Sequence, residues 1–297
     1  MVPGLLRVFY ETVRLGSIRR AGIEMGLASS SVSRQISLLE RQIGTTLFAR
    51  TARGMEVNHA GRLVADFARQ VVLDYDALKA DLDDFHGGRR AHIRIATVAS
   101  VIGAGPSIAI AKFTERFPKV TFEVNVVPAP AVVDAVLAAD VDIGLTYAME
   151  PDPKLKTIAR IFEPLVLLTA RREDEVEDFG QAEVTLDALD GLRLALPTPN
   201  FGVRRLLDHA CLNANLSLVP VLESDSFEIL RTFVLGGGST VLPSLALIGN
   251  DNSKIKISEI VDQRLQTRTI DLIVLKTRRL PRVMRLFLQD LHAQIEQ

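Results

Sequence analysis

Two stretches of this 297-residue chain alternate extended apolar runs with helical runs, and this alternation constrains the fold more than any other feature. The first stretch covers residues 92–146 and the second covers residues 192–242. Alternation of this kind is typical of a doubly wound, parallel α/β sheet. Because the pattern occurs twice, we expect two similar lobes. Residues 158–169 would cross from one lobe to the other, residues 269–276 would cross back, and residues 281–296 would form a closing helix.

Each stretch predicts three strands separated by helices. In the first stretch the strands are expected at His92–Val98, Val120–Val127 and Asp142–Thr146. In the second they are expected at Leu192–Leu196, Leu218–Leu222 and Ser239–Leu242.

The first sixty residues have a different pattern, that of short helices. A helix is predicted up to Gly16-Ser17, a second over residues 18–25, and a third over residues 28–43. Ser29-Ser30-Ser31 are candidate caps for the third helix, which Gly44 ends. Two helices of this length, joined by a tight turn with a glycine, form a helix-turn-helix.

Two short extended runs follow in residues 47–57, around a tip that contains Arg and Gly, and they predict a wing hairpin. A longer helix is then predicted from Ala60 to about Phe85. Its apolar residues recur every seven positions and form one stripe: Val64, Val71, Leu78 and Phe85, with Phe67, Tyr75 and Leu82 beside them. We expect this helix to pair with a second copy of itself. The alternative is a surface helix that lies on its own domain.

Charge is distributed unevenly along the chain. Residues 1–62 hold nine Arg and four Glu, with no Lys or Asp, so their net charge is +5, whereas the remaining residues sum to −6. A basic N-terminal segment on an otherwise acidic chain predicts a polyanionic partner for that segment alone. Gly87-Gly88-Arg89-Arg90 breaks the helical pattern and is the best domain boundary.

Three features predict a cytoplasmic protein. The chain has a single cysteine, Cys211, so it can form no intrachain disulfide. Its first residues lack the pattern of a signal peptide. No segment approaches the roughly 20 consecutive apolar residues that a membrane-spanning helix requires.

The N-terminal motifs resemble those of the LysR-type transcriptional regulators. The match is strong over the first eighty-odd residues and rests on the order and spacing of four motifs. These are Gly16-Ser17-Ile18-Arg19-Arg20-Ala21-Gly22; Ser29 to Glu40, with Val32-Ser33-Arg34-Gln35-Ile36 at its centre; Leu47-Phe48-Ala49-Arg50; and Ala60-Gly61. The remainder of the chain resembles the family by its α/β architecture and a few short motifs.

The resemblance implies a fold and a domain organisation. The fold is α/β, with a winged helix-turn-helix, a long linker helix and a two-lobed effector domain similar to the periplasmic binding proteins. The expected domains are residues 1–59 for DNA binding, 60–88 for dimerisation and 89–297 for the effector. Lobe I would comprise residues 91–160 and 268–297, and lobe II residues 161–267.

The resemblance also implies partners. It predicts a regulator that binds double-stranded DNA at a pseudo-palindromic operator and responds to a small molecule, such as a small carboxylate or an aromatic acid, bound between the lobes. Self-association as a dimer or tetramer and a contact with RNA polymerase are expected. A membrane partner, a cofactor and a metal site are not expected.

The predicted DNA-binding residues lie on the third helix and the wing. A recognition helix needs a slim entering end that carries hydroxyl, Gln or Arg side chains for phosphates and base edges. The residues expected to contact DNA are Ser17, Ser29, Ser30, Ser31, Ser33, Arg34, Gln35, Arg50 and Arg53. The family often has Gln-Pro where this chain has Ser29-Ser30, so base preference here is expected to differ. Arg50 is expected either to contact DNA or to pair with a local carboxylate.

The predicted effector residues follow strands of the two lobes. Ser100 ends the first strand. It is expected to cap the next helix, to contact the ligand or to do both. Asn200 and Phe201 occupy the facing position in the second lobe. Ala129 stands where relatives carry a hydroxyl, so that contact is in doubt. Phe227 is expected either to wall the cleft or to pack in the core.

The alternative function is an α/β enzyme or a solute-binding protein with an incidental basic bundle. Gly103-Ala104-Gly105 begins like a dinucleotide-binding loop, but Ile108 stands where the fingerprint requires its third glycine. Gly236-Gly237-Gly238 lacks the Lys of a phosphate-binding loop. The five His residues have no metal-ligand spacing, and no catalytic residue is predicted. We therefore expect a regulator and not an enzyme.

Overall fold

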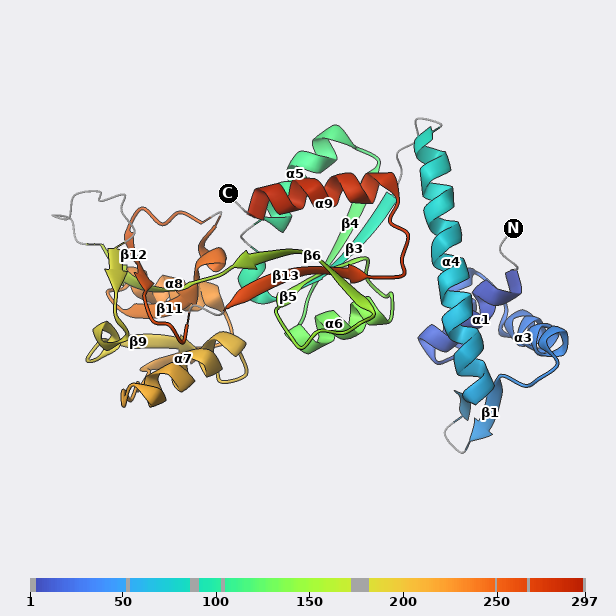
Figure 1. Ribbon diagram of the computed structural model, residues 1–297, viewed down its shortest axis with the longest axis horizontal. Coiled ribbons are helices and arrows are strands. Elements are labelled where there is room, and N and C mark those ends of the chain that lie inside the picture. Colours follow the sequence, from blue (N-terminus) through green and yellow to red (C-terminus); the bar gives the residue numbers. More distant parts are fainter. Residues whose placement is uncertain are drawn as a thin grey trace. The chain divides into compact units, whose positions relative to one another are not determined.

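The computed structural model describes residues 4–51, 54–85, 91–102, 105–171, 182–248, 250–265 and 268–295 (Figure 1). The chain divides into two compact units. One is formed by Met1–Ala91 with Lys276–Leu286, and the other by His92–Leu275 with Phe287–Gln297. In the part of the chain that the structure describes, no helix is both long enough and apolar enough to cross a bilayer.

The first unit begins with the predicted helix-turn-helix. Its helices are α1 (Gly4–Leu15), α2 (Ile18–Met25) and α3 (Ser29–Ile43), and each has one apolar face. The antiparallel strands β1 (Phe48–Thr51) and β2 (Gly54–Val57) form the predicted hairpin, and α4 (His59–Phe85) follows. Phe9, Leu39 and Leu47 are almost fully buried and pack with Ala68 and Val72 of α4, so α4 completes the core of this unit.

The start of α3 differs from the prediction. Ser29, Ser30 and Ser31 were candidate caps, but the N-cap residue is Ala28, whose side chain makes no cap hydrogen bond. The turn is tight because Gly26 adopts a left-handed conformation (φ 64°) and the Leu27 N–H donates to the Gly22 carbonyl at 2.8 Å. The three serines are therefore helical residues.

Asn58 holds the start of α4 against the wing. Its side chain accepts a hydrogen bond from the Gly61 N–H (2.7 Å) and donates one to the Thr46 carbonyl (2.7 Å), and its N–H donates to the Leu47 carbonyl (3.0 Å). A Cβ atom at position 61 would lie 2.0 Å from the Leu47 carbonyl oxygen, so only glycine allows this approach. Glu40 of α3 accepts a hydrogen bond from the Leu47 N–H at 2.8 Å and anchors the same segment.

The first lobe of the second unit is a five-stranded sheet in the order β4-β3-β5-β13-β6. Its strands are β3 (Ala91–Thr97), β4 (Val120–Val126), β5 (Ile143–Tyr147), β6 (Leu155–Phe162) and β13 (Thr269–Leu275). One face carries α6 (Ala129–Leu137), and the other carries α5 (Pro106–Arg116) and α9 (Arg282–Ile295) (Figure 1). Phe113, Phe122 and Phe287 join α5, β4 and α9, with ring centroids 4.7–6.1 Å apart.

The second lobe is a six-stranded sheet in the order β10-β9-β11-β7-β12-β8. Its strands are β7 (Leu165–Ala170), β8 (Ala182–Val184), β9 (Leu194–Pro197), β10 (Leu222–Ser224), β11 (Ser239–Pro243) and β12 (Ile255–Ile260). Alternate residues of β7 face opposite sides: Leu165 and Leu167 pack in the core with α7 (Gly202–Asn213), and Val166 and Leu168 pack in the core with α8 (Phe227–Leu235). Short 3-10 turns are η1 (Ala99–Val101), η2 (Leu186–Leu189) and η3 (Ser244–Leu247).

The chain crosses between the lobes twice. The first crossing lies within the predicted stretch, residues 158–169, but the second comes before the predicted stretch, because residues 269–275 form β13 in the sheet of lobe I. Glu163 and Pro164 connect β6 to β7, and residues 261–268 connect β12 back to β13. One crossing strand leaves lobe I and the other returns, so β13 runs antiparallel to β6. Each sheet is therefore mixed, with parallel pairs such as β3–β5 and β9–β10 beside antiparallel crossing strands.

One predicted strand was wrong in its bounds. The strand expected over Leu218–Leu222 is found only at Leu222–Ser224. Pro220 has no N–H to donate to a neighbouring strand, and the side chains of Val219 and Val221 are exposed.

Candidate functional site

The outward face of α3 carries most of the predicted DNA-contact side chains. Ser29, Ser30, Ser33 and Arg34 are exposed, whereas Val32, Ile36 and Leu39 on the opposite face are buried. This division follows from helical spacing, since residues 30, 33 and 34 share one side of the helix. The exposed end is slim because its side chains are serines, and no side chain caps its first N–H groups. The first N–H groups of α3 can therefore donate hydrogen bonds to phosphate oxygens.

The other predicted DNA-contact residues are less exposed or fall outside the description. Ser31 and Gln35 are half-buried. Ser17 is the N-cap of α2, and its hydroxyl accepts a hydrogen bond from the Arg20 N–H at 3.4 Å. Arg50 belongs to strand β1, but its side chain lies outside the described residues, as does the whole of Arg53.

Several exposed residues of this unit were missing from the predicted set. Ser37 lies one turn after Ser33 on the same side of α3, and its spacing alone could have found it. Arg19 and Arg20 in the first turn of α2 are exposed basic residues of the same unit. The +5 charge of residues 1–62 was the available signal for them.

The long helix α4 carries an exposed apolar stripe. Leu63, Phe67, Tyr75, Leu78 and Leu82 expose between 37% and 64% of their surface and follow one another at intervals of three, four or eight residues. At one end, Leu63 and Phe67 join Leu6, Leu39 and Ile43 in lining an apolar groove of about 450 Å³. An apolar stripe of this length on an exposed helix face is typical of a helix-pairing surface.

A cavity of about 360 Å³ lies between the two lobes of the second unit. Lobe I contributes residues at the ends of β3, β4 and β5 and at the start of α6. Lobe II contributes the loop before α7, the first turn of α7 and the residue that follows β10. The lining residues are Val98, Ala99, Val126, Val127, Pro128, Ala129, Pro130, Tyr147, Asn200, Phe201, Gly202, Arg205 and Asp225. The volume falls in the range of about 300–1,000 Å³ that is usual for small-molecule sites.

The structure brings three of the five predicted effector residues together in this lining: Ala129, Asn200 and Phe201. Ser100 is fully buried instead, and its hydroxyl is 3.2 Å from the hydroxyl of Tyr147, which itself lines the cavity. Phe227 packs behind the wall, with its ring 5.3 Å from that of Phe201. Roles for all five remain predictions.

Both signs of charge reach the cavity. The exposed guanidinium of Arg205 donates to the Asn200 carbonyl at 2.9 Å, and Asp225 is also exposed. The helices α6 and α7 begin at the cavity, and neither has a side-chain cap, so their N-terminal N–H groups add partial positive charge. The remaining wall is mostly apolar.

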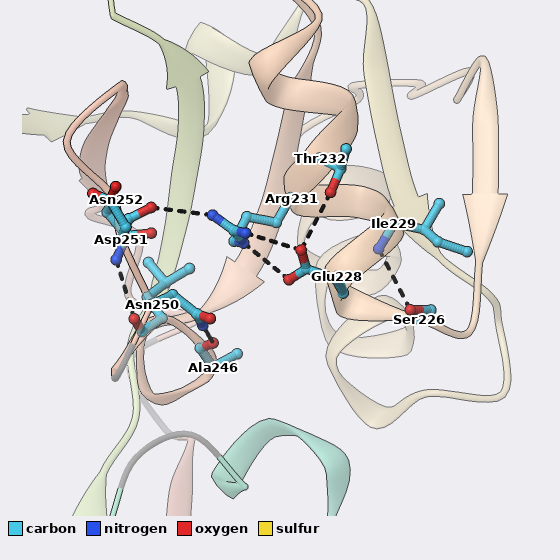
Figure 2. A network of polar contacts seen from close by, with 10 residues as sticks. Ser226, Glu228, Ile229, Arg231, Thr232, Ala246, Asn250, Asp251 and Asn252 are labelled. Carbon is cyan, nitrogen blue, oxygen red and sulfur yellow. Dashed lines mark hydrogen bonds and ion pairs between the residues drawn. The ribbon is translucent and has the colours of Figure 1, made fainter.

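A polar network holds α8 in place next to Asp225. The Ser226 hydroxyl accepts a hydrogen bond from the Ile229 N–H and caps the helix. Arg231 pairs with Glu228 at 2.9 Å and donates to the Asp251 carbonyl at 3.1 Å, so α8 is tied to the loop after η3 (Figure 2). The pair lowers the pKa of Glu228, because the charged carboxylate accepts the Arg231 hydrogen bonds.

Among the residues with polar side chains that line the cavity, Tyr147, Arg205 and Asp225 were not in the predicted set. Tyr147 is the last residue of a strand, where the rule for ligands at the carboxyl ends of strands could have found it. Arg205 lies one helical turn after Phe201 and faces the same space. Among the residues described, no three His, Cys, Asp or Glu side chains are placed to hold a metal ion.

Two family models match the chain. The bacterial regulatory helix-turn-helix protein, lysR family, matches residues 3–62, and the LysR substrate binding domain matches residues 86–296. Together they span almost the whole sequence.

Individual proteins agree with the family models. An uncharacterized HTH-type transcriptional regulator, YfeR of Shigella flexneri, is 28% identical over 88% of this chain and 85% of its own. The HTH-type transcriptional activator CmpR of a Synechocystis strain is 25% identical over 97% of this chain and 94% of its own. Among solved structures, a full-length OxyR variant of Pseudomonas aeruginosa has a TM-score of 0.71 at 15% identity and covers 99% of this chain and 98% of its own. Full-length CbnR complexed with its target DNA has a TM-score of 0.53 at 19% identity and covers 99% of this chain and 100% of its own.

Proposed function

Because this chain belongs to the LysR family of bacterial transcriptional regulators, we propose that α3 reads its operator and that the cavity between the lobes holds the effector. The family is one of DNA-binding regulators with an effector-binding domain, and not of enzymes. The single observation that supports the DNA proposal best is the division of α3 into a buried apolar face and an exposed face of Ser and Arg side chains.

The proposed organisation follows the sequence prediction. Residues 1–59 bind DNA, residues 60–88 pair with a second copy through the exposed stripe of α4, and residues 89–297 bind the effector. Pairing places two recognition helices on one duplex, so the operator is a pseudo-palindrome. The site of action is the cytoplasm, where the DNA lies.

Arg34 is the sharpest test of the recognition helix. The probe is a DNA duplex that the full-length protein has selected from a random pool. Replacing Arg34 with Ala is expected to weaken binding to this duplex by about 1–3 kcal/mol, because the contacts of the guanidinium with a base edge or phosphate are lost. Arg69→Ala on α4, which pairs with Asp66, removes the same charge and is expected to bind as the unaltered protein does. Equal affinities of the two variants in a gel-shift titration would contradict the assignment of α3.

A small carboxylate with an apolar body is the proposed effector class. The cavity has apolar walls, two uncapped helix N-termini and Arg205 to receive the carboxylate, and Asp225 to accept a hydrogen bond from a donor group. The candidate ligands are therefore small aliphatic and aromatic acids.

The carboxylate proposal is tested by thermal unfolding of the full-length protein with a panel of such acids and their uncharged amides. At least one acid is expected to raise the unfolding temperature where its amide does not. Ala129→Leu fills the cavity and should abolish the shift, while Ala138→Leu, at the exposed far end of the same helix, should preserve it. A shift that survives Ala129→Leu would place the ligand elsewhere.

A further inference from the structure

A buried ion pair lies where the chain crosses between the two lobes. Glu163 belongs to the outgoing crossover and Arg268 to the returning one, and their side chains are 0% and 5% exposed. The Arg268 Nε donates to the Glu163 carboxylate at 2.7 Å, and the Glu163 N–H donates to the Arg268 carbonyl at 3.1 Å. Side chains and backbone thus tie the two crossovers together at one point.

The same pair contacts the wall of the cavity. The Arg268 guanidinium lies over the ring of Tyr147, 3.9 Å from its centroid, and Tyr147 lines the cavity. The Ser100 hydroxyl is 3.2 Å from the Tyr147 hydroxyl, and Ser100 lies close enough to Glu163 to lower the pKa of that carboxyl. Tyr147 therefore contacts Arg268 directly through its ring, and its hydroxyl contacts Ser100, which lies beside Glu163.

The pair is incompletely satisfied in this arrangement of the lobes. Among the residues described, the Glu163 Oε1 and the Arg268 Nη2 are buried without a hydrogen-bond partner. Burial raises the pKa of the Glu163 carboxyl, against the opposing effect of Arg268. A buried polar atom without a partner is costly, so the energy of this pair depends on where the two crossovers hold its side chains.

We propose that Glu163 and Arg268 are positioning residues that set the arrangement of the lobes, and that a ligand in the cavity acts on them through Tyr147. This inference rests on the proposed function of the cavity as the effector site. A ligand that packs on Tyr147 changes how its ring stacks on Arg268 and how its hydroxyl meets Ser100. The contact with Arg268 and the contact with Ser100 both connect Tyr147 to the crossovers, and the lobes turn about these crossovers.

The test measures the distance between the lobes in the full-length protein without ligand. Spin labels are attached at Asp134→Cys on α6 and Ser217→Cys after α7, both exposed, in a Cys211→Ala background, and the distance distribution is recorded by double electron–electron resonance. Glu163→Gln and the conservative Arg268→Lys are compared with Asp271→Asn. Asp271 is the matched control, because it also joins β13 to β6, through a buried carboxylate 2.6 Å from Arg160, but within lobe I.

We expect Glu163→Gln and Arg268→Lys to shift or broaden the distance distribution and Asp271→Asn to leave it unchanged. A loss of stability alone would not move the distances of the folded molecules. Unchanged distributions in Glu163→Gln and Arg268→Lys would overturn the proposal, and so would the same change in Asp271→Asn. Failure of the carboxylate panel would contradict the effector proposal, but it would leave this ligand-free measurement as it stands.

Discussion

At the scale of single residues, hydrogen-bond partners decide which polar groups can meet a ligand. Ser100 was predicted to end the first strand of lobe I, but β3 ends at Thr97 and Ser100 lies in the turn η1, fully buried, with its hydroxyl 3.2 Å from that of Tyr147. Its nearness to a strand end was readable from the sequence. The residue that covers it comes from β5, some fifty positions later, and no local pattern links the two.

Cys211 provides a prediction about reactivity. Burial raises the pKa of its thiol to about 11, so at pH 8 roughly 0.1% would be thiolate, compared with about 10% at the ordinary pKa of 9.0. We expect iodoacetamide to alkylate Cys211 at least about tenfold more slowly in the native protein than in the same protein unfolded in urea. Mass spectrometry of timed samples measures both rates, and equal rates would show that the thiol is accessible.

Glu163 provides a prediction about pH. Its folded-state pKa is raised above the ordinary 4.5, so the folded protein binds this proton more tightly than the unfolded chain does. The stability that this group contributes is fully present below about pH 4.5 and is lost as the pH rises through the folded-state pKa.

Relative to Glu163→Gln, which does not titrate, the wild-type protein is therefore expected to lose stability as the pH rises from 4.5, by at most about 1.4 kcal/mol per pH unit. Thermal unfolding of both proteins across this range measures the difference. A difference that moves in the opposite direction would mean that Arg268 lowers the pKa of Glu163 below its ordinary value.

At the scale of elements, helical spacing carried most of the predictive information. The division of α3 into a buried and an exposed face follows from the positions of Val32, Ile36 and Leu39 alone. The cap was mispredicted because serine's preference for N-cap positions competed with the tight turn at Gly26, and the turn decided where the helix begins.

Substitution of Gly61 tests how closely the wing must pack against the start of α4. Gly61→Ala would place a methyl group 2.0 Å from the Leu47 carbonyl oxygen, so the backbone must shift, at an expected cost of about 1–3 kcal/mol. Gly4→Ala, which meets nothing within 4 Å, is the control. Circular dichroism should show a lower unfolding temperature for Gly61→Ala alone, and an unchanged temperature would mean that α4 can move away from β1 without cost.

The stripe on α4 provides a prediction about association. Leu78→Glu puts a charge on the apolar surface that is proposed to pair, and should reduce the mass measured by light scattering to that of a monomer. Lys79→Glu places the same carboxylate on the next residue, which is exposed and already charged, and should keep the wild-type mass. If Leu78→Glu also keeps that mass, the stripe is not the pairing surface.

At the scale of the whole molecule, symmetry predicts the form of the operator. Two copies paired through α4 present two α3 helices, and their half-sites should lie about 10 base pairs, or a multiple of it, apart. Inserting about 5 base pairs between the half-sites of a selected operator should weaken binding strongly, and inserting about 10 should restore part of it. Binding that does not depend on the insertion would contradict paired recognition helices on one face of the duplex.

The sequence by itself determined the helix-turn-helix, the wing, the long apolar helix and the two α/β lobes with their two crossovers. Each of these depends on periodicity, turn residues or motif order within a short stretch of chain, so local physics is sufficient. Only the tertiary structure decided that Tyr147 and Arg205 line the cavity, that Ser100 lies behind Tyr147, and that Glu163 meets Arg268. Glu163 and Arg268 are 105 positions apart. Their meeting depends on how two sheets are connected, and residue spacing carries no signal for it.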